Sequence, residues 1–128
     1  MKTARERPKV AGAWLALGSG QGTRETAPPE AVLLDPVIHE RTRLAILTAL
    51  ATAPEGERSF MDLRDALKLT DGNLLTHLRT LDAARLVDCV KTGAGRGSNT
   101  TVRLTAAGRQ RFRTYLDRLE ALIRAARG

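Results

Sequence analysis

Residues 68–104 have the sequence KLTDGNLLTHLRTLDAARLVDCVKTGAGRGSNTTVRL. In its first part, Leu74, Leu78 and Leu81 recur at helical spacing after Thr70, a residue type that caps helix N-termini. In its second part, the β-type segments LVDCV and TTVRL flank KTGAGRGSN. Glycine in a connection between two such segments is typical of a hairpin. The stretch therefore predicts a helix followed by a β-hairpin with a long, glycine-rich tip.

The face of this helix opposite the leucine stripe is small and polar. Gly72 and Thr76 keep it thin, so that the backbone can approach another molecule. Asn can bond to adenine through two hydrogen bonds and Arg can do the same to guanine in the DNA major groove. Backbone N–H groups at the start of the helix, near Thr70, suit a phosphate. We therefore expect DNA contacts from Thr70, Gly72, Asn73, Thr76, Arg79 and Thr80.

The hairpin suits the sugar-phosphate backbone. Its glycines let the tip follow the surface of a duplex, and Lys91 and Arg96 neutralise phosphate charge. We expect Ser98 and Asn99 to add polar contacts to the backbone, and Lys68, in the turn before the helix, to add a further cation.

Two further helices are predicted upstream. Asp35-Pro36 is a helix-start signal, and the segment VIHERTRLAILTALA follows it until Ala53-Pro54-Glu55-Gly56 ends the helix. Ser59 then opens a short helix with Asp62 at the third helical position, a variant of the capping box. Its apolar residues fall at i, i+3 and i+7, on one face.

A last helix is predicted over about residues 105–126, with Thr105 as its cap. Its apolar residues form an a/d seam over two heptads. Because the preceding helices and hairpin already make a closed small unit, we expect this seam to pack against a second copy of the chain. The alternative is that it folds back on its own domain. The seam consists of Phe112, Tyr115, Leu116, Leu119, Leu122 and Ile123.

The charge of the chain is concentrated in its second half. Of 128 residues, 21 are Lys or Arg and 14 are Asp or Glu, which gives a net charge of +7. Residues 31–67 carry four cations and six anions, whereas residues 68–128 carry twelve cations and five anions. A basic balance argues for a polyanionic partner, and this distribution places its surface after residue 67.

Several function classes are disfavoured by composition. One cysteine and two histidines make a zinc site improbable, and we expect no metal or cofactor. No apolar run approaches the ~20 residues of a membrane helix, and no base–nucleophile or carboxylate pair is placed for catalysis, so we expect neither a membrane protein nor an enzyme. We expect Cys89 to be a small core residue and His77 to be half-buried on the flank of its helix.

The run LDPVIHERTRLAILTALA and residues 60–112, from FMDL to RQRF, resemble the ArsR and MarR-like winged helix-turn-helix regulators, most closely the small stand-alone winged helix DNA-binding domain. Asp71-Gly72-Asn73-Leu74 and the Leu-Thr-x-x-Gly of Leu104 to Gly108 carry much of this likeness. The resemblance implies a mainly α protein with a small β-hairpin (α+β) and a C-terminal dimerisation helix. Its members usually have Gly in left-handed conformations where this chain has Lys68 and Arg85.

The resemblance implies a cytoplasmic homodimer that binds double-stranded DNA at a dyad-related operator, as a transcriptional regulator. We expect a repressor, and activation is the alternative that the sequence leaves open. Related regulators can also take a small-molecule effector, although nothing in this sequence marks a pocket for one. The alternative function is a winged-helix protein-interaction module, in which the predicted DNA-contacting residues would be idle. We expect residues 1–30 to be a flexible tail and residues 31–128 to form the domain.

Overall fold

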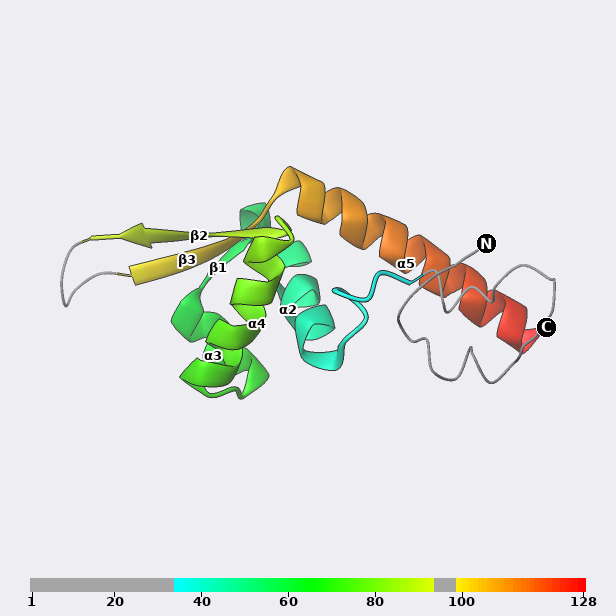
Figure 1. The fold of residues 1–128 in the computed structure, drawn as a ribbon, viewed down its shortest axis with the longest axis horizontal. Coiled ribbons are helices and arrows are strands. Elements are labelled where there is room, and N and C mark those ends of the chain that lie inside the picture. The colour runs from blue at the N-terminus through cyan, green and yellow to red at the C-terminus, as the bar shows by residue number, and fades with distance from the viewer. Residues whose placement is uncertain (1–33, 94–98) are drawn as a thin grey trace, which may run out of the picture.

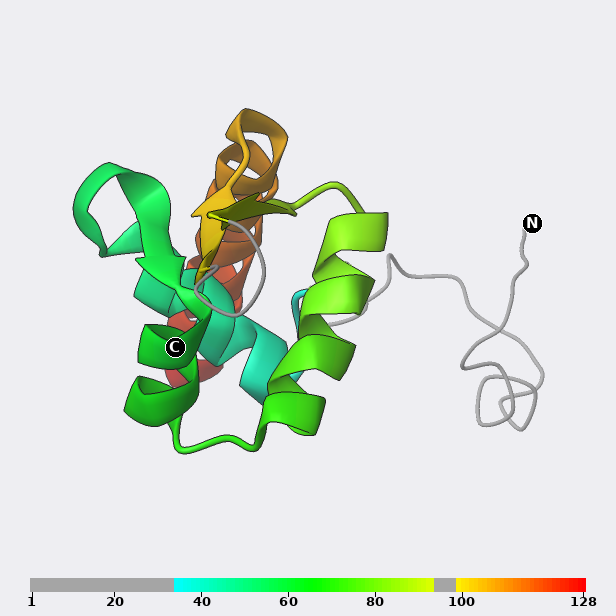
Figure 2. The ribbon, with the colours of Figure 1, turned by 90° about the vertical axis from the view of Figure 1, so that its left-hand side faces the viewer.

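The computed structural model describes residues 34–93 and 99–128, and shows a small mainly helical domain with a short sheet (Figure 1). The predicted tail lies outside the described residues. The β2–β3 hairpin projects from one end of the molecule and the C-terminal helix runs toward the other, with the remaining helices between them (Figures 1 and 2). The elements are α2 (Arg41–Ala51), a 3-10 turn (Pro54–Gly56), β1 (Glu57–Ser59), α3 (Phe60–Leu67), α4 (Asp71–Ala83), β2 (Val87–Thr92), β3 (Asn99–Leu104) and α5 (Ala106–Arg127).

The three strands form an antiparallel sheet in the order β1-β3-β2. The predicted hairpin is confirmed, with Val87 opposite Leu104 and Cys89 opposite Val102. The sequence did not indicate β1, whose three residues pair with Arg103 to Thr101 of β3. This strand is too short to carry a period of its own, and it exists because β3 offers it a free edge.

The first helix begins later than predicted. Asp35-Pro36 opens only a single turn, in which the Asp35 carboxylate accepts the N–H of Val37 at 3.0 Å. The other carboxylate oxygen of Asp35 is bound by Arg111 of α5, at 2.6 and 3.1 Å. Glu40 is the actual N-cap, because its extended backbone lets its side chain accept the N–H of Arg43 at 2.8 Å. The helix start predicted at Asp35 is therefore wrong, and α2 begins at Arg41.

The other predicted caps are confirmed. The Ser59 hydroxyl accepts the N–H of Asp62 at 3.0 Å at the start of α3, and Thr105 caps α5 by accepting the N–H of Gly108 at 2.8 Å. The Asp62 carboxylate does not return to the Ser59 backbone but binds Arg58 at 3.0 Å. Only the first half of the predicted capping box is thus present.

Helices α2, α3 and α4, the sheet and the start of α5 enclose one core. The inward stripe predicted for α4 is confirmed, since Leu74, Leu78 and Leu81 are buried. Phe112 and Tyr115 of α5 are also buried, at 5% and 1% exposure, with their rings stacked 6.3 Å apart. The prediction that these two residues face a second copy of the chain is therefore wrong, because the core of their own protomer leaves room for them.

Lys68 and Arg85 both adopt the left-handed conformation, with φ of 56° and 65°. Lys68 ends α3, and its N–H donates to the carbonyls of Arg64 and Asp65. Arg85 makes the turn from α4 to β2, and its N–H donates to the backbone carbonyl of Asp82 at 2.9 Å. The family that this chain resembles usually has glycine at these two positions. Here the same left-handed conformation is adopted by residues with a Cβ atom, which strains the backbone.

Replacing Arg85 by Gly should raise the free energy of unfolding by about 1 kcal/mol, because Gly adopts this conformation without a steric penalty. Chemical denaturation monitored by circular dichroism measures the change. Exposed Arg113, inside α5, is the matched control, because Arg113→Gly removes the same side chain from a helical position and should destabilise by about 1 kcal/mol. Equal effects of the two substitutions would contradict the strain at Arg85.

A close contact joins α5 to the end of α4. The Thr105 hydroxyl donates to the carbonyl of Arg85 at 2.8 Å, and the Thr105 N–H donates to that of Leu86 at 3.0 Å. Gly108 is buried against the same turn, and a Cβ atom built on it would clash with the carbonyl oxygen and carbon of Leu86. The Leu-Thr-x-x-Gly pattern therefore sets how closely α5 approaches α4.

Candidate nucleic-acid interface

Helix α4 presents a thin polar face to solvent. Leu74, Leu78 and Leu81 anchor its inner side in the core, which fixes the direction of the outer side. Of the residues predicted on this outer face, Gly72, Asn73, Thr76 and Arg79 are exposed, whereas Thr80 is half-buried. A Cβ atom on Gly72 would meet nothing within 4 Å. The arrangement brings four of these five residues together on one accessible surface.

The N-terminus of α4 is held by Thr70, whose hydroxyl oxygen accepts the N–H of Asn73 at 3.1 Å. Thr70 is itself exposed. Its predicted place at the helix start is confirmed, and the acceptor side of its hydroxyl is used within the helix. The hydrogen of the same hydroxyl can still be donated to a nearby acceptor, such as a phosphate oxygen.

An ion pair next to this helix start was not foreseen from the sequence. Asp71 is exposed, and its carboxylate binds the guanidinium of Arg64, on α3, at 2.9 Å. Arg64 also binds Asp65 at 3.0 Å. The hydrogen bond to Asp71, followed by that to Asp65, raises the pKa of Arg64 above its usual value. Arg64 thus offsets an acidic charge that would otherwise oppose a phosphate at the helix N-terminus.

The inner flank of α4 is braced by α2 through His77, which is half-buried as predicted. Its Nδ1 atom lies 3.2 Å from a guanidinium nitrogen of Arg43 and 3.7 Å from the carboxylate of Glu40. The Nε atom of Arg43 also donates to the carbonyl of Val37 at 2.6 Å. Burial raises the pKa of Glu40, but backbone hydrogen bonds from Arg43 and Thr42 outweigh it and leave that pKa lowered. His77 therefore positions the helix and does not point to its outer face.

The outer face carries one long cation. Arg79 is exposed, and its guanidinium makes no hydrogen bond or ion pair with another described residue. The Thr80 hydroxyl, in contrast, donates to the carbonyl of Thr76 at 3.3 Å. Arg79 can therefore reach a ligand without first breaking an intramolecular contact.

The residues predicted on the hairpin are placed only in part. Lys91 on β2 and Asn99 on β3 are exposed. They lie near the end of the described hairpin, where Thr92 pairs with Asn99. Arg96 and Ser98 lie outside the described residues. Lys68 is exposed in the turn between α3 and α4, two residues before the Thr70 cap.

Cys89 is exposed, so its prediction as a core residue is wrong. Val87, two residues earlier on the same strand face, is fully buried. On β2 this face therefore becomes exposed between Val87 and Cys89, while Val102, which lies opposite Cys89 on β3, is still buried. Beyond these residues the hairpin extends past the helices (Figure 1). Desolvation, and then the charges of Asp82 and Asp88, raise the pKa of the Cys89 thiol. A raised pKa disfavours the thiolate that a redox switch requires.

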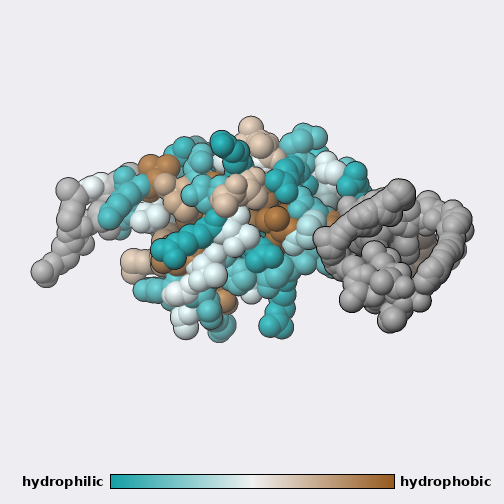
Figure 3. All heavy atoms as spheres, viewed as in Figure 1, coloured by the Kyte–Doolittle hydropathy of each residue, from teal (hydrophilic) through white to brown (hydrophobic). Residues whose placement is uncertain are grey.

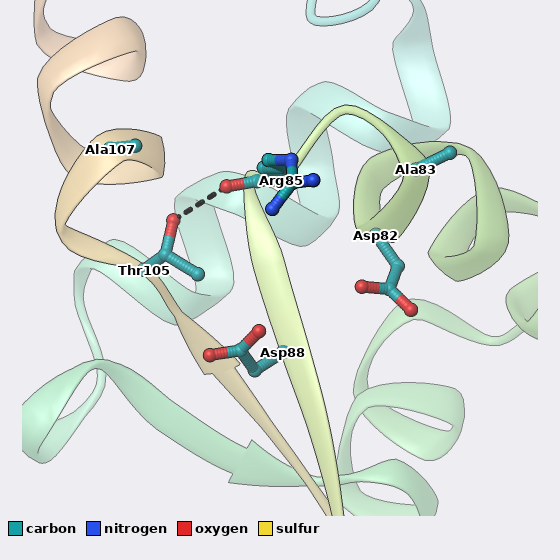
Figure 4. Close-up of a pocket in the computed structure, with 6 residues that line it drawn as sticks. All are labelled: Asp82, Ala83, Arg85, Asp88, Thr105 and Ala107. Carbon is teal, nitrogen blue, oxygen red and sulfur yellow. Dashed lines mark hydrogen bonds between the residues drawn. The ribbon is translucent and has the colours of Figure 1, made fainter.

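A hollow of about 530 Å³ lies where α4, β2 and α5 meet, and Figure 4 shows its lining. It is lined by Asp82, Ala83, Arg85, Asp88, Thr105 and Ala107. Small-molecule sites are mostly apolar with few polar groups. This lining has two carboxylates, a guanidinium and no large apolar side chain, so it does not have the character of an effector site.

The described residues contain no group of three or more His, Cys, Asp or Glu side chains that could hold a metal ion. Within the same ranges, no helix has both the length and the apolar character needed to cross a bilayer.

These features define a winged helix-turn-helix protein: the order of the helices, the three-stranded sheet with its projecting hairpin, and the exposed polar face of α4. In this class α4 is the recognition helix and the β2–β3 hairpin is the wing. Residues 42–123 match the family model described as the winged helix DNA-binding domain. The chain therefore belongs to the winged helix DNA-binding domain family.

Solved structures of transcriptional regulators share this fold. A transcriptional regulator homologue from Pyrococcus horikoshii OT3 is 28% identical, with a TM-score of 0.68 over 76% of this chain and 94% of that chain. A possible transcriptional regulator for arsenical resistance is 26% identical, with a TM-score of 0.51 over 70% of this chain and 88% of that one. AbsC, a MarR family regulator from Streptomyces coelicolor, is 21% identical over 62% of this chain and 53% of its own, with a TM-score of 0.54, and is similar in fold.

No curated protein sequence matches the chain significantly. The fold and family are those of DNA-binding transcriptional regulators.

Proposed function

We propose that the protein is a transcriptional repressor that binds double-stranded DNA sequence-specifically, as a homodimer, at a dyad-related operator. The observation that carries this proposal is the outer face of α4, on which Gly72, Asn73, Thr76 and Arg79 are exposed together while the leucine stripe holds the helix in the core. A thin polar helix face with Asn and Arg suits the major groove, where these side chains can bond to adenine and guanine.

Each group of exposed residues has a proposed role. Asn73, Thr76 and Arg79 contact base edges, and half-buried Thr80 contributes at the margin of the same face. The Thr70 hydroxyl and the first N–H groups of α4 bind a phosphate, with the Arg64–Asp71 ion pair reducing the repulsion between Asp71 and that phosphate. Lys68, Lys91 and Asn99, together with Arg96 and Ser98 of the wing tip, contact the backbone of the duplex.

The proposed dimer uses the part of α5 that its own protomer leaves uncovered. Leu116 and Ile123 are 43% and 45% exposed, and Leu119 and Leu122 are only partly covered by the core. Leu116 and Ile123 are seven residues apart, so they lie on one side of the helix. Binding to two half-sites one turn of the duplex apart requires the two recognition helices of such a dimer to lie about 34 Å apart.

Selection from a randomised duplex library tests this function. The full chain should enrich one sequence with two inverted half-sites, and should bind it at least about a thousandfold more tightly than a scrambled duplex at physiological salt. Equal binding of all duplexes, lost at that salt, would mean that only the net charge is acting. That outcome would overturn specific DNA recognition and favour the interaction-module function.

Replacing Lys91 by Gln should weaken binding to the selected and the scrambled duplex by the same factor. A phosphate contact carries no base information, so the ratio of the two affinities should stay constant while the salt dependence falls by about two units, one for each protomer of the dimer. Fluorescence anisotropy at several salt concentrations measures both quantities. Arg127→Gln, which removes one charge at the opposite end of the molecule, is the matched control and should leave the salt slope almost unchanged (Figure 1). An equal change in slope for both variants would contradict the contact.

A further inference from the structure

Leu75 is an apolar residue on the exposed side of the recognition helix. Its side chain is 42% exposed, although Leu74 and Leu78 on either side of it in the sequence are buried. Sequence reasoning placed only small and polar residues on this face and left Leu75 out. Leu75 is nevertheless more exposed than Thr80, which was predicted to contact DNA.

The helix geometry puts Leu75 beside the residues proposed to contact bases. At about 100° per residue, Leu75 lies about 80° to one side of the centre of the Gly72–Thr76 face, and Asn73 lies about 80° to the other side. Arg79 follows Leu75 by four residues, so the two side chains are neighbours on the helix surface. Leu75 therefore occupies the edge of the outer face on which Arg79 also lies.

Nothing in the protomer accounts for this exposure. Four large apolar side chains are exposed in the described part of the chain, namely Met61, Leu75, Leu116 and Ile123. Leu116 and Ile123 belong to the proposed dimer surface, and Met61 is on α3. The face of the molecule visible in Figure 3 is largely hydrophilic, with apolar patches that are small and separate.

We propose that Leu75 is a specificity-determining residue that packs against the C5-methyl group of a thymine in the major groove. That methyl group is the apolar feature that a base edge presents there, and apolar side chains read it by contact. The inference rests on the proposed function and extends it to one base. Because four residues of helix rise about 6 Å, the thymine should lie within about two base pairs of the position that Arg79 contacts.

Deoxyuridine substitution tests this contact, since it removes the thymine methyl and leaves every hydrogen-bonding group in place. The probe is the highest-affinity duplex from the library selection, with each thymine replaced in turn. For the wild-type full chain, one substitution per half-site should weaken binding about fourfold, the value of one buried methyl group. For Leu75→Ala, the same substitution should have no effect. Ala favours helix, and circular dichroism confirms that the variant is folded.

Met61→Ala is the matched control, because it removes a side chain that is 57% exposed on a different helix. It should keep the fourfold sensitivity to deoxyuridine. Full sensitivity in Leu75→Ala, or no sensitive thymine in the wild type, would overturn the proposal while specific DNA binding stands. Failure of the selection to enrich any duplex would instead overturn the proposed function, and the thymine contact with it.

Discussion

Replacing Gly108 by Ala should lower the free energy of unfolding by about 3 kcal/mol, because the added methyl group meets backbone and not a movable side chain. The atoms in its way are the carbonyl oxygen and carbon of Leu86, and this carbonyl already accepts the N–H of Thr105 at 3.0 Å. The turn cannot retreat without breaking that bond. Urea denaturation followed by circular dichroism measures the loss.

The effect of Gly108→Ala should extend to the position of α5. If the helix moves outward to admit the methyl group, Phe112 and Tyr115 lose contacts in the core, and the hydrogen bond at 2.8 Å between the Tyr115 hydroxyl and His39 is stretched. Gly72→Ala is the control, since a Cβ atom there has open space and Ala favours helix. Gly72→Ala should be neutral or stabilising by up to about 1 kcal/mol. Equal stability of the Gly108 variant and the wild type would contradict the close contact.

Replacing Arg79 by Ala should weaken binding to the selected duplex by about 10- to 100-fold for each half-site of the dimer, the range expected when one bidentate contact to guanine is removed. Affinity for a scrambled duplex should fall much less, because only a charge is lost there. Exposed Arg79 makes no ion pair with another described residue, so the loss reflects the missing contact and not a broken fold. Anisotropy titrations with both duplexes give the two affinities.

Two variants separate the roles that Arg79 can have. Arg79→Lys keeps the charge but loses the planar fork, and should recover binding to the scrambled duplex without recovering preference for the selected one. Arg113→Ala removes an exposed arginine from α5 and should change both affinities little. An equal loss of affinity for both duplexes on Arg79→Ala would make Arg79 a phosphate contact and would contradict base recognition.

The local signals of the sequence predicted the helical and hairpin elements well. The spacing of Leu74, Leu78 and Leu81 indicated the buried side of α4, and Ser59, Thr70 and Thr105 were correctly predicted as caps. Caps and periodicity depend on residues within one or two turns of each other, so a single sequence is enough to reveal them. The helix start predicted at Asp35 was wrong because Glu40 caps α2 instead. The Asp35 carboxylate caps only a single turn and also binds Arg111, far along the chain.

The candidate interface was predicted in outline for the same reason. The outer face of α4 follows from its inner stripe, so the helical period alone places Gly72, Asn73, Thr76 and Arg79 together. Leu75 was missed because apolar residues were assigned to the core, and the Arg64–Asp71 ion pair was missed because it joins two helices.

The sequence by itself determined the order of the helices and the hairpin and the polar face of the recognition helix, because each depends on spacing and capping within a short segment. Its resemblance to a known family indicated the winged helix-turn-helix class. Only the tertiary structure decided that β1 joins the sheet, that Phe112 and Tyr115 enter the core of their own protomer, and that Cys89 is exposed. These outcomes depend on which surface is left uncovered once distant segments meet. Periodicity indicates which side of an element is apolar. Whether that side is buried depends on the segment that packs against it.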